Sequence, residues 1–218
     1  MCTALDVAKV FIKKGLDTNR NKFDGNMKLQ KLLFFANLIS LSEKGKPLFE
    51  DSFNAFSNGC VIESIRLRYR NDCANLCADS SVFEPNFSQD EYDVVNLTVE
   101  LFGDLSAREL SEINHTFDFW NNAYKRSLQA DGYKNKDSSL ITLDEMLSEV
   151  KKMKYVIEQF KNTAYERMCE EVVNGIKFYY STDFEMTDEV LEQLVEFSRE
   201  AEDSSYSVYF EEGNLVIY

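Results

Sequence analysis

The organising segment of this sequence is residues 27–70, which read MKLQKLLFFANLISLSEKGKPLFEDSFNAFSNGCVIESIRLRYR. Its first part spaces apolar side chains as one face of a helix does, and these are Leu29, Leu32, Leu33, Ala36 and Ile39. Gly45 and Pro47 predict the end of that helix, and residues 49–56 read as a short, irregularly apolar run that is extended. Such an apolar segment does not stay solvated, so we expect it to form the core of a first domain.

The flanking sequence predicts further helices. One spans residues 6–14, and helical patterning resumes over residues 61–69 before a fraying end. Three capping boxes, each with a hydroxyl residue followed three positions later by Glu, mark helix starts at Ser88, Ser106 and Thr142. We expect the helix after Thr142 to run on without a break through Met146, Val150, Met153 and Ile157. We also expect a short helix to occupy residues 163–173, with Asn174 and Gly175 as its stop.

The end of the chain changes character. Residues 176–180, IKFYY, are typical of a strand, and Thr187 is placed to cap a helix. Residues 206–210 and 215–218 read as two strands joined by a hairpin turn. The predicted fold class is therefore mainly α, a helical domain with a short extended segment, followed by a small α+β appendage in the order β-α-β-β. We place the two domains at residues 1–138 and 139–218.

Charge is distributed unevenly along the 218 residues. Residues 1–139 hold 20 acidic and 17 basic side chains, whereas residues 140–218 hold 18 acidic and 7 basic ones. An acidic segment repels nucleic acid and attracts a basic protein. The simpler alternative is that these acids only solvate surface helices.

Cysteine usage and hydropathy predict a cytoplasmic protein. The five cysteines are odd in number, and the first residues lack the apolar stretch of a signal peptide. Cys73 and Cys77 lie four residues apart, but no second pair completes a zinc set. No apolar run approaches the roughly 20 residues that span a bilayer. We expect no membrane association, no metal and no cofactor.

The residues offer little for catalysis. His115 is the single histidine, and phosphate-binding glycine motifs and a serine nucleophile elbow are missing from the sequence. We therefore expect the protein not to be an enzyme. Lysines at 22, 28 and 31 and arginines at 66, 68 and 70 are the clusters able to contact phosphates. The overall acidity predicts no stable nucleic-acid complex, and a solvated or internally paired set of bases is the simpler interpretation.

Several spaced blocks resemble the Panacea (SocA-like) antitoxin domain over about residues 3–130. They are KLQKLLFFA at 28–36, GKPLF at 45–49, NAFSNG at 54–59 and GDLSARELS at 103–111, followed by a histidine and a tryptophan. The residues that match the family motif are Lys28, Leu29, Gln30, Lys31, Leu32, Gly45, Pro47, Phe56, Gly59, His115 and Trp120.

This sequence departs from the family pattern at three positions. Phe56 replaces the usual tryptophan, and Cys60 stands where a proline follows the glycine. Asn114 precedes the histidine in place of a small or hydroxyl residue. Loss of the proline is expected to loosen the turn, because proline restricts the backbone.

The resemblance implies a non-enzymatic antitoxin that neutralises a toxin or effector by stoichiometric protein–protein binding. Two alternatives remain open: a phage- or mobile-element-encoded inhibitor of a host defence nuclease or effector, which could mimic nucleic-acid charge, and an adaptor that delivers its partner to a protease. We expect the partner to be a basic protein, with the second domain as the specificity surface. Its candidate contact residues are Phe178, Tyr179, Tyr180, Glu189, Glu192, Glu196, Tyr206, Tyr209, Glu211 and Glu212.

Overall fold

The computed structural model describes residues 2–128, 135–166, 168–211 and 213–218. The chain divides into two compact units, Met1–Val156 and Ile157–Tyr218. The fold is mainly helical with a small β appendage, which confirms the predicted class.

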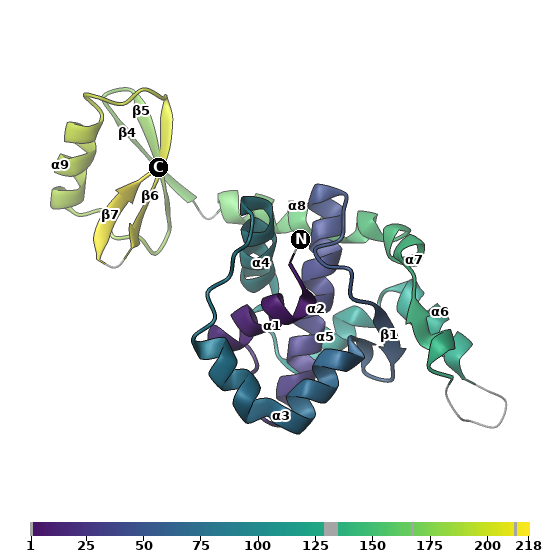
Figure 1. Ribbon diagram of the computed structural model, residues 1–218. Coiled ribbons are helices and arrows are strands. Elements are labelled where there is room, and N and C mark those ends of the chain that lie inside the picture. Colours follow the sequence, from purple (N-terminus) through teal and green to yellow (C-terminus); the bar gives the residue numbers. More distant parts are fainter. Residues whose placement is uncertain (1, 129–134, 167, 212) are drawn as a thin grey trace. The chain divides into compact units, whose positions relative to one another are not determined.

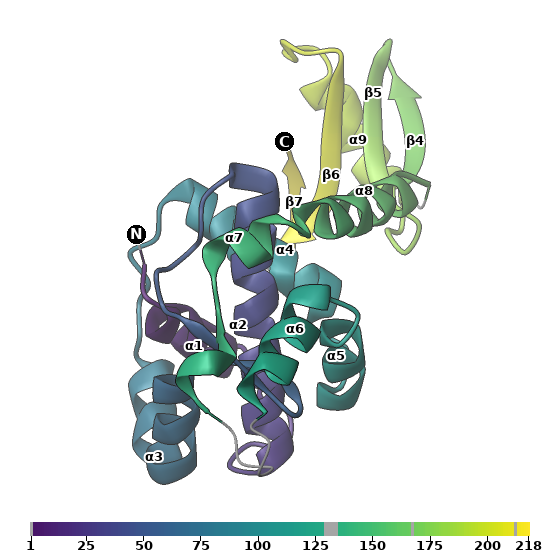
Figure 2. The same ribbon diagram turned by 90° about the vertical axis from the view of Figure 1, so that its right-hand side faces the viewer.

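The first unit is built around one long helix, α2 (Phe23–Lys44). Figures 1 and 2 both show α2 in the middle of this unit with shorter helices around it. Its neighbours are α1 (Ala4–Lys13), α3 (Glu63–Ser81), α4 (Gln89–Phe102) and α5 (Ala107–Asn114). Helix α2 is therefore buried on all sides, not on one stripe only, and its polar residues are buried with the apolar ones. Gly45 ends it in the left-handed conformation, as expected, with φ of 69°.

A small sheet lies beside α2. The extended run predicted over residues 49–56 contains β1 (Phe53–Phe56), which pairs antiparallel with β2 (Gly59–Val61). A third strand, β3 (Leu140–Ile141), pairs with the other edge of β1. Helix α6 (Asp118–Ser127), a 3-10 turn (Asp137–Ser139) and helix α7 (Leu143–Leu147) complete this region. Residues 137–141 are thus part of the first unit.

The predicted capping boxes are present at all three helix starts. Ser88, Ser106 and Thr142 each accept the backbone N–H of a glutamate three residues later, and that glutamate accepts the N–H of the capping residue. The expectation of one unbroken helix after Thr142 is wrong, because α7 ends at Leu147 and α8 (Val150–Glu166) begins after it. Between them the buried carboxylate of Glu149 accepts the N–H of Phe119 at 2.9 Å. This contact ties the break to the start of α6.

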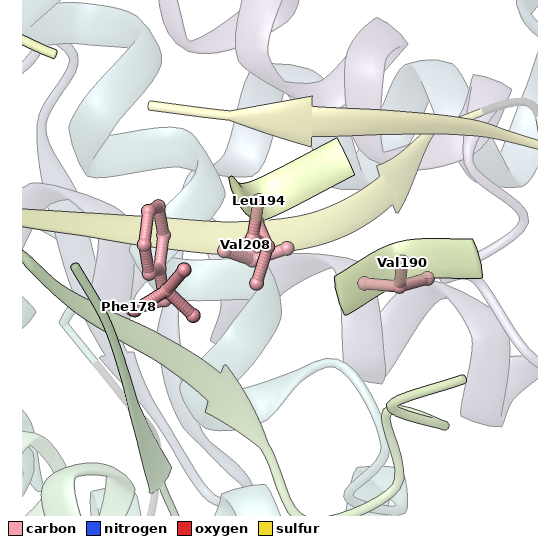
Figure 3. Close-up of a cluster of buried hydrophobic side chains, with 5 residues drawn as sticks. Phe178, Val190, Leu194 and Val208 are labelled. Carbon is pink, nitrogen blue, oxygen red and sulfur yellow. The ribbon is translucent and has the colours of Figure 1, made fainter. Parts of the chain in front are cut away.

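The second unit is a four-stranded sheet with one helix on it. The strands are β4 (Met168–Val173), β5 (Ile176–Ser181), β6 (Ser205–Glu211) and β7 (Asn214–Ile217), in that order across the sheet. Helix α9 (Asp188–Phe197) connects β5 to the parallel strand β6, and the outer pairs are antiparallel. Figure 3 shows Phe178, Leu194 and Val208 converging from β5, α9 and β6.

The expected helix over residues 163–173 is wrong. Helix α8 ends at Glu166, and residues 168–173 form strand β4. The order of elements in the appendage is therefore β-β-α-β-β, with one strand more than predicted. The residues taken as a helix stop, Asn174 and Gly175, both have positive φ, of 51° and 86°. Two such residues make the tight turn that joins twisted strands, and Val173 accordingly pairs with Ile176. The Asn-Gly pair was therefore a hairpin signal.

Candidate functional site

Two polar residues of the family motif, Gln30 and Lys31, extend from α2 to the backbone at the end of the β1–β2 hairpin. The Gln30 side-chain oxygen accepts the N–H of Ile62 at 2.8 Å, and the Lys31 ammonium donates to the carbonyl of Cys60 at 3.1 Å. Both side chains are buried, with exposed fractions of 1% and 0%. Burial lowers the pKa of Lys31 from 10.5 to about 8. These two residues thus hold backbone groups of the hairpin at the surface of α2.

Gly59 allows the hairpin to approach these side chains closely. Its φ of 103° is in the region that favours glycine. A Cβ atom at this position would lie only 2.1 Å from Oδ1 of Asn114 and 2.7 Å from Nζ of Lys31. The motif therefore needs glycine here for both backbone and packing reasons.

Asn114 and Cys60, two departures from the family pattern, bind each other. The Asn114 side-chain oxygen accepts the N–H of Cys60 at 2.8 Å. A proline at position 60 has no N–H, so it would not need this acceptor. The hydrogen bond holds the backbone at position 60, where the family's proline would restrict it. The expectation of a loosened turn considered the missing proline but not this hydrogen bond.

Helices α5 and α6 contact the turn of the β1–β2 hairpin through side-chain hydrogen bonds. The Trp120 indole N–H donates to the carbonyl of Phe56 at 2.9 Å, and Ser111 donates to the carbonyl of Asn58. His115 stacks on Trp120 with ring centroids 3.9 Å apart. Loss of hydration lowers the pKa of His115, and the charge of Lys31 lowers it further. His115 therefore packs against Trp120 beside the hairpin.

The remaining motif residues lie away from the hairpin. Lys28 donates to the carbonyl of Gly103 at 2.7 Å and to Thr18, and burial lowers its pKa. Leu29 and Leu32 are fully buried in the core. Gly45 and Pro47 lie at the far end of α2, where Asn37 and Ser40 bind the turn. The motif thus positions several loops around one helix.

The candidate contact residues of the second unit fall on opposite faces. Strand register places Tyr179, Tyr209 and Glu211 on the sheet face away from α9. Phe178, Tyr180 and Tyr206 point to the α9 side, and Phe178 is fully buried in the core. The exposed Glu189, Glu192 and Glu196 lie on α9 itself, and Glu212 lies outside the described residues. These candidate contact residues are therefore distributed over both faces of the sheet and over α9.

Among the residues that the structure describes, no group of three or more histidine, cysteine, aspartate or glutamate side chains could hold a metal ion. Within the same residues, none of the helices has both the length and the apolar character to cross a bilayer.

The hairpin, its supporting helices and the α2 motif coincide with the region that matches a known family. Residues 29–121 match the model of the antitoxin SocA-like, Panacea domain. Comparison with curated proteins and with solved structures found no match to this chain. Three residues of this range, Gln30, Lys31 and Trp120, make the hydrogen bonds to the backbone of Ile62, Cys60 and Phe56. Residues 29–121 of this chain are therefore similar to the antitoxin SocA-like, Panacea domain.

Proposed function

We propose that this protein is an antitoxin that neutralises a toxin or effector protein by direct stoichiometric binding. The match of residues 29–121 to the Panacea domain carries the proposal, because that domain belongs to an antitoxin family. Its motif residues support this reading, since Gln30, Lys31 and Trp120 are engaged with backbone groups of the hairpin. The domain acts as a scaffold, and its action needs no bond-breaking step.

The second unit supplies partner specificity in this proposal. Glu189, Glu192 and Glu196 are spaced three and four residues apart, so they share one face of α9. All three are exposed. A helix face of this charge favours encounter with a basic protein, since opposite potentials raise the association rate. The α9 face is therefore our candidate contact surface.

The test begins by capturing the partner from the native host with the tagged full chain and identifying it by mass spectrometry. Co-expression then measures rescue of growth, and sedimentation measures stoichiometry. A fixed-ratio complex that inhibits the partner supports the proposal. Partner turnover by the isolated chain, or no effect on the partner, would refute it. Loss of the partner by proteolysis after binding would favour delivery to a protease over masking.

The contact surface is tested with a matched pair of triple variants in the full chain. Glu189→Gln, Glu192→Gln and Glu196→Gln together remove three charges from α9. The control removes three exposed charges from the first unit, at Glu50, Glu100 and Asp104. We expect the α9 variant to bind the captured partner at least tenfold more slowly at low salt, and the control to bind normally. Equal effects would reject the α9 face.

A further inference from the structure

A cavity of about 460 Å³ opens between the first half of α2, the first half of α3 and the hairpin. Its volume is in the range of small-molecule sites. Asn26 and Gln30 line it from α2, Arg66 and Arg70 line it from α3, and Phe56 lines it from β1. In each helix the two polar residues are four apart, so they are neighbours on one face.

Two of these side chains carry unpaired polar atoms whose orientation is settled. Gln30 accepts the Ile62 N–H through its oxygen, so its amide nitrogen is the free end. Asn26 donates its amide nitrogen to the Arg66 carbonyl at 3.0 Å, so its oxygen is the free end. Both free atoms are buried without a partner. Buried polar atoms are costly when unpaired, and here one donor and one acceptor lie a turn apart.

The cavity is also cationic. Among the described residues that line it, Lys22, Lys31, Arg66 and Arg70 are basic and none is acidic. The Arg66 Nε is buried without a partner, and its guanidinium lies 5.4 Å from the centre of the Phe56 ring. The carboxylate of Glu63 lies 3.5 Å from the guanidinium of Arg66, and it also pairs with Lys136. The exposed Arg70 makes no ion pair with the described residues. Guanidinium groups in this state favour an oxyanion.

A carboxylate does not complete the site, because it would serve the arginines and Gln30 but offers no proton to the free oxygen of Asn26. Inorganic phosphate carries a hydroxyl proton near pH 7, but it has no flat ring to lie against Phe56. A nucleobase edge carries a donor beside an acceptor, and its flat ring suits an aromatic wall such as Phe56. We propose that this cavity binds a nucleoside monophosphate, with its phosphate on Arg66 and Arg70 and its base edge on Gln30 and Asn26. This site is separate from the α9 face and independent of the antitoxin proposal.

The experiment titrates the full chain with the four ribonucleoside 5′-monophosphates, the matching nucleosides and inorganic phosphate, by calorimetry. At least one monophosphate should bind tenfold or more tightly than its nucleoside and than phosphate. Arg70→Gln should weaken that monophosphate at least tenfold, because Arg70 contacts the phosphate and has no folded-state ion pair to lose. Arg68→Gln is the matched control, because Arg68 is on the same helix, outside the cavity, and pairs with Asp79.

Asn26→Ala tests the base edge. It should reduce the preference among the four monophosphates while inorganic phosphate binds as before, and Trp120 fluorescence checks that the fold is kept. The proposal is overturned if no monophosphate binds more tightly than phosphate, or if Arg68→Gln and Arg70→Gln weaken it equally. It is also overturned if only the captured protein partner, and no monophosphate, depends on Arg70, because the cavity then receives an acidic side chain of that partner.

Discussion

Replacing Lys31 with methionine tests whether this motif residue works inside the fold. Its side chain is fully buried, and burial lowers its pKa from 10.5 to about 8. Below pH 8 the lysine is protonated in both the folded and the unfolded chain, so the folded state carries the whole cost of burying the charge. Between the two pKa values the unfolded chain holds a proton that the folded chain has released. Stability therefore rises with pH in this window.

The magnitude follows from the two pKa values. With a folded pKa of about 8 and an unfolded pKa of 10.5, linkage predicts that the wild type gains about 1.3 kcal/mol relative to Lys31→Met between pH 7 and pH 9. Methionine keeps the length of the side chain and removes its titration. It also leaves the Cys60 carbonyl without its donor, a cost of about 1–3 kcal/mol at either pH.

The assay is urea unfolding at pH 7 and pH 9, followed by fluorescence of Trp120, the single tryptophan of the chain. Burial raises the pKa of Cys60 to about 12, and this thiol is present in both proteins, so its own titration largely cancels in the comparison. Lys44→Met is the control, because Asp90 raises the pKa of Lys44 and keeps it protonated throughout. A stability difference for Lys31→Met that does not change with pH would show that the buried-charge argument is wrong.

Three further predictions concern the hairpin and the second unit. Gly59→Ala should destabilise the first unit by about 3 kcal/mol or more in the same assay, whereas Gly175→Ala, where a Cβ meets no atom within 4 Å, should cost about 1 kcal/mol by thermal unfolding. Cys60→Pro should lower the free energy of unfolding less when it is combined with Asn114→Ser, because the double variant leaves no buried Asn114 oxygen without a donor. If the two substitutions change the free energy of unfolding additively, the pairing of these residues is contradicted. Leu194→Ala should cost the second unit about 2–5 kcal/mol, seen as faster proteolysis within residues 157–218 with unchanged Trp120 fluorescence; simultaneous loss of both signals would show that the two units unfold together.

Much of the secondary structure was predictable because its signals are local. A capping box needs only a hydroxyl and a carboxylate three residues apart, so Ser88, Ser106 and Thr142 mark helix starts without knowledge of the fold. Gly45 likewise ends α2 through its own backbone freedom. The Asn174-Gly175 pair was equally local, and the error there came from reading a hairpin turn as a helix stop.

The candidate site was predictable only in part. Its family resemblance singled out Gln30, Lys31, Gly59 and Trp120, but Asn114 entered only as a departure from the pattern. The reason for Asn114 is a hydrogen bond to Cys60, 54 residues earlier in the chain. Likewise, the faces of the second unit depend on strand pairing between β5 and β6 across an intervening helix.

The amino-acid sequence by itself determined the helix starts at Ser88, Ser106 and Thr142, the end of α2 at Gly45, the acidity of residues 140–218 and the resemblance to the domain family, because each depends on neighbouring residues or on spaced motifs. Only the tertiary structure decided that polar residues of α2 are buried, what each binds, and that Gln30 and Arg66 line one cavity. The physical reason is that a buried polar group is stable only with a partner, and the partners here lie tens of residues away.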